Sequence, residues 1–296
     1  MAFDATELFD AEFLESLEHL RLVARRVPAG GRFAEQRSAE LGQGIEFRDY
    51  RPYAPGDDLR GVDWNIYGRL GRVFLRLFEE QQDLPLYLLP DVSKSAFLEQ
   101  PPRALAGLRA TLALAAIGLG QHDKVGVFPF AEDLSVLIRP QSGQGRVLTF
   151  ARRLAEVEPG GRTDLATCLR RLAGMRLRQG LLVIVSDFFD PAGIDAVVEA
   201  LGQVRQRLLL VQLVKAADRE PQLQGDVRLV DCETGAVEDV SVTAAVLESY
   251  RAAYDRFEES LTAFARRRQA GLLRLDVDRP VVPQLASLFE GGHLAV

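Results

Sequence analysis

The chain has 296 residues, of which 47% are hydrophobic and 26% charged, with a formal net charge of -6 and a pI of about 5.3. This composition is typical of globular proteins and leaves room for one large domain with a smaller companion. An acidic surface argues against nucleic acid as the main partner, because binding phosphates requires a basic face.

The two cysteines, Cys168 and Cys232, are far apart and form neither a metal-binding spacing nor a disulfide framework, which favours a reducing compartment. The first residues lack the basic-then-apolar pattern of a signal peptide. The most apolar stretch falls short of the roughly 20 apolar residues that a membrane span needs. We therefore expect a cytoplasmic protein without a membrane span.

Residues 1–82 are expected to form a small N-terminal segment of mixed α+β structure. Apolar residues recur at helical spacing over residues 10–26 and predict a helix there. Residues 32–80 contain turn chemistry, notably Pro55-Gly56-Asp57-Asp58, and are expected to form short strands and turns.

Residues 83–296 alternate between apolar runs and amphipathic stretches, which predict strands and helices in turn. The expected strands cover residues 84–89, 124–131, 134–138, 181–186, 207–214 and 272–277. The expected helices cover residues 101–120, 145–157, 164–178, 192–203 and 243–268, with a short one closing the chain. A hairpin insertion is expected at about 226–240. This order predicts a doubly wound α/β fold, with a mostly parallel sheet and helices on both faces.

Two of the predicted parallel strands end in an acid, Asp91 and Asp187. Ligands in open α/β sheets bind beyond the carboxyl ends of the strands. Ser93 and Ser95 follow Asp91 at alternate positions, and Thr163 lies in a later loop at the start of a helix. Hard oxygen ligands of this kind suit Mg²⁺ or Mn²⁺ and not zinc. The alternative is that the acids shape turns and the hydroxyl groups cap helices.

This ordered set resembles the metal-ion-dependent adhesion site of von Willebrand factor A-type (integrin I-like) domains, a Rossmann-type fold. The upstream residues 46–53, 55–60 and 63–64 resemble the signature of the bacterial family called "domain of unknown function 58", and that resemblance covers nearly the whole chain. Carried over by position, the resemblance implies five metal ligands: Asp91, Ser93, Ser95, Thr163 and Asp187.

The resemblance also implies a role in protein binding. Members of the family are often encoded beside MoxR-type AAA ATPases, which implies such an ATPase as the partner, in chaperone-like assembly or maturation. A metal ion in the site would accept a Glu or Asp carboxylate from the partner. This chain departs from the family pattern at Lys94, where a small residue is usual, and at Ala96, where Met is usual. A lysine that pointed inward would oppose a cation.

A partner surface is expected at Asp57, Asp58, Arg60, Asp63 and Lys94. The alternative for the upstream residues is a Pro-Gly turn in which the Asp side chains bond the backbone, with Trp64 in the core.

We expect a binding module and not an enzyme. The chain has no phosphate-binding P-loop, no nucleophile elbow of the G-x-S-x-G type and no H-E-x-x-H zinc motif. The sequence leaves two alternatives open. One is a Mg²⁺-dependent hydrolase acting on phosphate or ester substrates. The other is a metal-free scaffold with a degenerate site.

Overall fold

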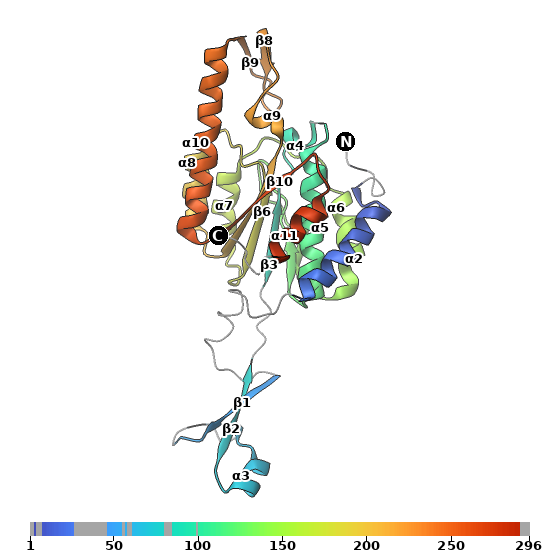
Figure 1. Ribbon diagram of the computed structural model, residues 1–296, viewed down its shortest axis with the longest axis vertical. Coiled ribbons are helices and arrows are strands. Elements are labelled where there is room, and N and C mark those ends of the chain that lie inside the picture. Colours follow the sequence, from blue (N-terminus) through green and yellow to red (C-terminus); the bar gives the residue numbers. More distant parts are fainter. Residues whose placement is uncertain are drawn as a thin grey trace. The chain divides into compact units, whose positions relative to one another are not determined.

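The computed structural model describes residues 3, 8–26, 46–54, 57, 61–79, 85–98 and 100–290 (Figure 1). The chain divides into two compact units. The larger unit comprises Met1–Val27 and Leu84–Val296, and the smaller unit comprises Pro28–Asp83.

This division differs from the predicted boundary at residues 82 and 83 in the placement of the N-terminal helix. That helix, α2 (Ala11–Arg26), packs on α5 (Arg103–Gly120) and α11 (Val281–Glu290) of the larger unit. Its apolar side chains, Phe13 and Leu17 among them, are part of that unit's core. Burial of this apolar face therefore decides to which unit the helix belongs.

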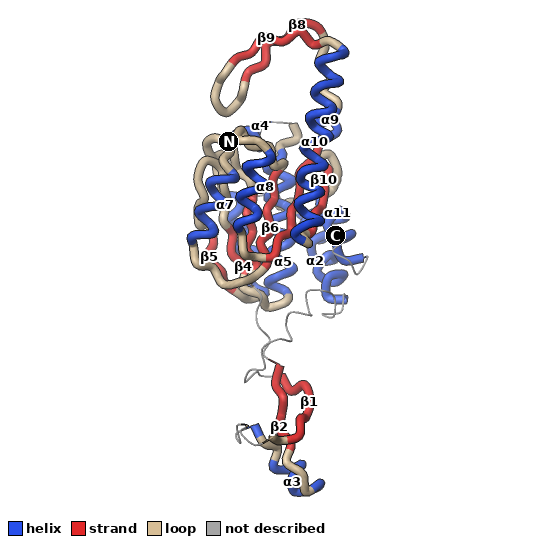
Figure 2. The backbone as a smooth tube through the Cα atoms, turned by 90° about the vertical axis from the view of Figure 1, so that its left-hand side faces the viewer, coloured by secondary structure: helices blue, strands red, loops and turns tan. Residues whose placement is uncertain are grey.

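The larger unit is built on a six-stranded sheet with the order β10-β7-β6-β3-β4-β5 (Figure 2). Its strands are β3 (Leu86–Pro90), β4 (Val125–Val127), β5 (Ile138–Gln141), β6 (Leu181–Ser186), β7 (Arg207–Val214) and β10 (Gly271–Asp276). All neighbouring strands pair in parallel except β5, which is antiparallel to β4. This is the doubly wound, mostly parallel sheet that the sequence predicts.

The predicted strand at residues 134–138 lies too early in the chain. Leu134 forms only an isolated bridge with Phe130, and β5 begins at Ile138.

Helices cover both faces of the sheet (Figures 1 and 2). Alternate residues of β3 supply the two cores: Leu86 and Leu88 pack with α2, α5, α6 and α11, whereas Tyr87 and Leu89 pack with α7, α8 and α10. The remaining helices of the unit are α4 (Lys94–Leu98), α6 (Val147–Ala155), α7 (Leu165–Gly174), α8 (Ile194–Gln203), α9 (Ala216–Arg219) and α10 (Ala244–Arg268), with a short 3-10 turn at Gln144–Arg146.

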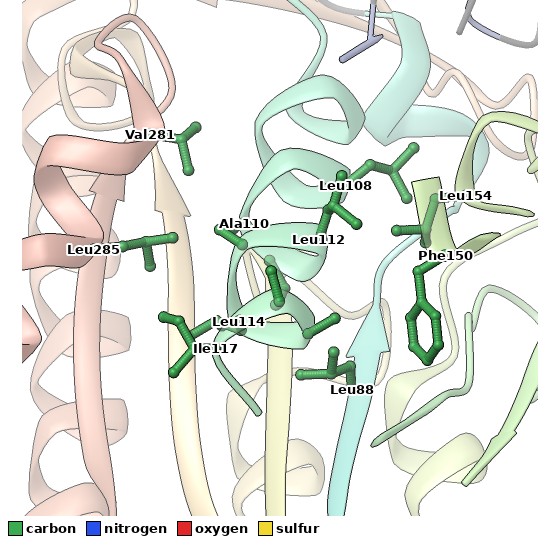
Figure 3. Close-up of a cluster of buried hydrophobic side chains, with 14 of the residues drawn as sticks. Leu88, Leu108, Ala110, Leu112, Leu114, Ile117, Phe150, Leu154, Val281 and Leu285 are labelled. Carbon is green, nitrogen blue, oxygen red and sulfur yellow. The ribbon is translucent and has the colours of Figure 1, made fainter. Parts of the chain in front are cut away.

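Helix α5 is the centre of the first core. By length and composition it could cross a membrane, but 83% of its apolar window is buried inside the protein, as in the core helix of a globular domain. Figure 3 shows its side chains between Phe150 and Leu154 on one flank and Val281 and Leu285 on the other.

The predicted insertion is an antiparallel hairpin of β8 (Gly225–Val230) and β9 (Val237–Val242). Most residues of both strands are exposed. Figure 2 shows the connecting loop turned back toward the end of the sheet where α4 lies.

The smaller unit contains the antiparallel pair β1 (Glu46–Pro52) and β2 (Phe74–Glu79). Between these strands lies α3 (Trp64–Leu70), a helix that the sequence pattern does not predict. Asp63 starts this helix, because its Oδ1 accepts hydrogen bonds from the N–H groups of Asn65 (2.9 Å) and Ile66 (3.2 Å). The alternative interpretation of Trp64 as a core residue is wrong, because 63% of its surface is exposed.

Replacing the buried Leu112 tests the central role of α5. Leu112 is fully buried, so Leu112→Ala is expected to lower the free energy of unfolding by about 2–5 kcal/mol. Leu148→Ala is the matched control, because Leu148 lies on α6 with 59% of its surface exposed. Urea denaturation followed by circular dichroism measures both. Equal effects of the two changes would contradict the assignment of α5 as the core helix.

Candidate functional site

The site is built around Asp91, which directly follows the central strand β3. After β3 the chain forms β4 on one side of β3 and later β6 on the other side. The loops diverge at this point, which is where open α/β sheets bind their ligands. The N–H of Asp91 donates to the carbonyl of Val185 (2.9 Å), and the N–H of Val92 donates to that of Phe130 (2.9 Å). The segment is thus fixed to both neighbouring strands.

The Asp91 carboxylate is buried, with 5% of the residue exposed. Its Oδ1 accepts the N–H of Ser93 (2.9 Å) and its Oδ2 accepts the hydroxyl of Ser186 (2.6 Å). Burial raises the pKa of Asp91 above its ordinary value despite these bonds, and the nearby charge of Glu233 adds to the increase. Ser186, the last residue of β6, is a site residue that the sequence motif does not reveal.

The two predicted serines lie side by side at the start of α4. Their hydroxyl oxygens are 3.0 Å apart. Ser93 is buried, whereas Ser95 is partly exposed. Lys94, between them, has an exposed side chain, and its N–H donates to the carbonyl of Gly161 (3.0 Å). Both hydroxyl groups therefore lie together at the turn into α4, and the lysine side chain is exposed to solvent.

Thr163 reaches the site because its loop packs closely on the loop after β4. A Cβ at Gly160 would lie 2.4 Å from that of Ala131 and 3.1 Å from the carbonyl oxygen of Val92. The N–H of Gly160 donates to the Val92 carbonyl (2.6 Å), and that of Asp164 donates to the Ala131 carbonyl (3.0 Å). Only glycine permits this approach, which fixes the backbone just before Thr163.

Glu233, from the tip of the β8–β9 hairpin, joins Ser95 to Thr163. Its Oε1 accepts the hydroxyl groups of Ser95 (2.7 Å) and Thr163 (2.8 Å), and its Oε2 accepts the N–H of Thr163 (2.9 Å). Burial acts to raise the pKa of Glu233, but the bonds from Thr163 and Ser95 outweigh it and the pKa is lowered. The sequence places Glu233 in a hairpin turn but gives no signal that the turn reaches the sheet edge.

Asp187 follows β6, the neighbour of β3. Burial, with a further contribution from Asp91, raises its pKa to about 7, and Arg103 partly opposes the increase. Its Oδ1 accepts the N–H of Phe189 (3.0 Å). Phe188, between them, has a φ of 64°, a left-handed conformation that costs a residue with a bulky side chain roughly 1–3 kcal/mol. The turn after β6 is thus strained at the residue next to the acid.

Arg103 is a further site residue that the sequence reasoning does not identify. It lies at the start of α5 and is 3% exposed. Its Nε is 3.6 Å from Asp187 Oδ2, and its guanidinium donates to the Leu213 carbonyl (3.0 Å) and to both carboxylate oxygens of Asp218. One signal for it is that Arg103 and Arg109 are the two charged residues of a mostly apolar helix.

The structure brings the five predicted ligand residues together at one edge of the sheet. Ser95, Thr163 and Asp187 line a cavity of about 590 Å³, with Arg103 and Glu233 among its other lining residues. Ser93 is linked to this cavity through its contact with Ser95, and Asp91 through its contact with Ser93.

The chemistry of these side chains fits a hard divalent cation. The pKa of Asp91 responds to Glu233 and that of Asp187 responds to Asp91, so three carboxylates act on one another at this edge. In the described part of the chain, no three His, Cys, Asp or Glu side chains form a metal-binding group. A metal ion here would therefore depend on the hydroxyl oxygens, which suit Mg²⁺ or Mn²⁺ and not zinc.

The predicted partner surface in the smaller unit has structural roles where it is described. Asp57 accepts the N–H of Ala54 (2.8 Å) and pairs with Arg51 (2.8 Å). Asp63 is buried, caps α3, and accepts the hydroxyl of Tyr50 (3.2 Å). These are the turn and cap roles of the alternative interpretation. The predicted residues Asp58 and Arg60 lie outside the described residues.

Lys94 lies near the tip of the hairpin. The pKa of the Cys232 thiol is raised by burial and by Glu233 and Asp231, and the charge of Lys94 opposes this increase. The lysine is therefore a neighbour of an acidic turn, on the outside of the site.

Asp187 is expected to make the protein less stable as the pH rises in the absence of divalent cations. Its folded-state pKa of about 7 lies above the ordinary value of 3.8, so the folded state holds a proton that the unfolded chain releases. The stabilisation is complete below about pH 4 and is lost as the pH rises through about 7. Relative to Asp187→Asn, the wild type is expected to lose about 1 kcal/mol or more between pH 5 and pH 8.

Urea denaturation in EDTA at several pH values measures this difference. Asp195→Asn is the control, because Asp195 is exposed in the first turn of α8. If the wild type and Asp187→Asn showed the same pH dependence, the raised pKa would be wrong.

Comparisons with known proteins identify the family of the chain. A family model described as "Protein of unknown function DUF58" matches residues 49–260. Uncharacterized proteins from Mycobacterium bovis (Mb1516) and Mycobacterium tuberculosis (Rv1480) are each 26% identical over 281 residues, which cover 92% of this chain and 87% of theirs.

Similar solved structures include the conserved hypothetical protein BatB from Bacteroides thetaiotaomicron, with a TM-score of 0.43 and 13% identity over 71% of this chain and 98% of that chain. Another is the manganese-loaded TRAP protein of Plasmodium vivax, with a TM-score of 0.35 and 20% identity over 44% of this chain and 57% of that chain. Since the family model spans most of the sequence, this chain belongs to the family described as Protein of unknown function DUF58, and its larger unit has a doubly wound α/β fold.

Proposed function

We propose that the protein is a binding module that recognises a carboxylate of a partner protein through a divalent cation held at the edge of the sheet. One observation carries the proposal: three of the five predicted ligand residues, from three separate loops, line one cavity, and hydrogen bonds connect the other two, Ser93 and Asp91, to Ser95. The cavity edge also holds a carboxylate already, that of Glu233, which shows that Ser95 and Thr163 can bind such a group.

The predicted ligand residues fall into a charged group and a neutral group. Asp91 and Asp187 would supply the negative charge that holds Mg²⁺ or Mn²⁺, and the hydroxyl groups of Ser93, Ser95 and Thr163 would supply neutral oxygen ligands. The two carboxylates would formally balance the charge of the ion, so a carboxylate of the partner would bind by filling a coordination position that the protein leaves open. Lys94 is exposed outside this set of ligands, so its charge would oppose the ion only through solvent, where such interactions are weak.

The partner that we propose is a MoxR-type AAA ATPase, in chaperone-like assembly or maturation in the bacterial cytoplasm. The support is the family to which the chain belongs, whose members are often encoded beside such ATPases. On this proposal the chain itself catalyses no reaction: it presents a binding site, and the ATPase supplies the energy.

Metal binding is tested first with a charge-removing change at the centre of the site. Asp91→Asn preserves the shape of the side chain and keeps an acceptor for the Ser93 N–H, and its amide group can donate to the Ser186 hydroxyl, but it removes the charge that would hold a cation. Calorimetric titration with Mg²⁺ and Mn²⁺ is expected to show saturable binding to the wild type and to Asp195→Asn, weakened at least about tenfold in Asp91→Asn, equivalent to about 1.4 kcal/mol. Equal affinity of Asp91→Asn and the wild type would contradict the site.

Partner capture then separates the three functions that the sequence left open. The immobilised protein is expected to retain a co-encoded MoxR-type ATPase in Mg²⁺ and to release it in EDTA, and Asp91→Asn is expected to capture little. Capture that is equal in Mg²⁺ and EDTA would favour the metal-free scaffold. Hydrolysis of p-nitrophenyl phosphate that is lost in Asp91→Asn would favour the hydrolase.

A further inference from the structure

We propose that Glu233 is an internal ligand of the carboxylate-binding position, and that a partner binds by displacing the tip of the β8–β9 hairpin with a glutamate of its own. This inference rests on the proposed function. It names the chemical group that the site accepts and the segment of this chain that occupies the position of that group.

The contacts of Glu233 are those of a bound ligand. Both carboxylate oxygens are bonded, and all three donors belong to Ser95 and Thr163, two of the predicted metal ligands. The Ser95 bond joins residues 138 positions apart in the chain. A glutamate that served only to shape its own hairpin would bond within the turn, as Asp231 does.

Asp231 presents Glu233 to the site in a fixed conformation. Its Oδ1 accepts the N–H groups of Glu233 (2.8 Å) and Thr234 (3.2 Å), and its Oδ2 accepts the Thr234 hydroxyl (2.6 Å). Gly235 closes the turn with a φ of 73° and donates its N–H to the Asp231 carbonyl (2.8 Å). A turn organised in this way loses little conformational entropy when its glutamate binds.

The rest of the hairpin holds the tip in place only weakly. Both strands are mostly exposed, and large apolar residues on them remain in contact with solvent: Leu229 is 43% exposed, Val230 60% and Val237 57%. Because so little apolar surface would be lost, release of the tip costs mainly the bonds of Glu233. These are charge-assisted hydrogen bonds, which a glutamate of the partner can form in place of Glu233.

The cavity beside the tip indicates what accompanies the glutamate of the partner. Its lining includes apolar side chains, namely those of Phe189, Pro191, Ile194 and Phe257, beside charged ones. Phe189 is 39% exposed, and its ring centroid is 4.9 Å from that of Phe257. The matching partner segment is a short acidic turn that places an apolar side chain next to its glutamate.

A peptide that copies the tip tests the displacement. The probe is a fluorescein-labelled cyclic peptide with the sequence of residues 229–238, carrying Cys232→Ser to prevent oxidation. Its binding is measured by fluorescence anisotropy in Mg²⁺ and in EDTA. The probe is expected to bind the Glu233→Ala protein at least about tenfold more tightly than the wild type, because the apparent affinity for an occupied site falls with the open fraction. A probe that also carries Glu233→Gln is expected to bind neither protein.

The matched control is Glu238→Ala, which removes an exposed carboxylate from β9 of the same hairpin. It is expected to behave as the wild type. Hydrogen exchange supplies a second measurement that needs no ligand: the amide of Thr163, which donates to Glu233, is expected to exchange faster in Glu233→Ala than in Glu238→Ala. Equal peptide affinities for the wild type and Glu233→Ala, or an unchanged Thr163 amide, would overturn the inference.

These outcomes are separable from failure of the proposed function. If the peptide prefers Glu233→Ala equally in Mg²⁺ and in EDTA, the internal ligand stands and the role of the cation is wrong. If the wild type binds Mg²⁺ in an Asp91-dependent manner but Glu233→Ala gains no affinity for the peptide, the metal site stands and the internal ligand is wrong.

Discussion

A carboxylate at the end of a buried strand has to find donors that replace water, and this constraint shapes the whole edge of the sheet. Asp91 follows the central strand, where its charge is removed from solvent and its pKa is raised. The Ser186 hydroxyl and the Ser93 N–H, which come from two different segments, donate hydrogen bonds to this carboxylate. Asp187, one strand away, faces the same constraint, and Arg103 meets part of it. A bound cation would stabilise the negative charge of Asp91 and Asp187, which these interactions compensate only in part.

The strand ends could be predicted from the sequence because they depend on local pattern. A continuous apolar run marks a strand buried on both faces, and its first polar residue marks the edge. Parallel strands finish at the same edge, so the proximity of Asp91 and Asp187 follows from the order of the elements. The 3.0 Å contact between the hydroxyl groups of Ser93 and Ser95 depends instead on the turn into α4, because alternate residues share a face in a strand but not in a helix.

The other half of the site depends on contacts that no local pattern encodes. Glu233 reaches Ser95 from a hairpin inserted between α9 and α10, and neither the length of that hairpin nor its turn type specifies its direction. Arg103 looks like the first residue of a helix, and its burial depends on the position of Asp218 far along the chain. Helix α3 could not be predicted from the sequence for a different reason. None of its seven residues, Trp64–Leu70, is buried, so they show no apolar periodicity.

The exposed Trp64 has a spectroscopic consequence. It is the single tryptophan of the chain, and it belongs to the smaller unit. Indole emission therefore reports on α3 and its surroundings, and an indole this exposed emits close to the wavelength of the unfolded chain. The larger unit, which holds the site, contributes only tyrosine and phenylalanine emission of its own. A tryptophan placed at Phe189, beside the cavity, would give that unit its own optical signal.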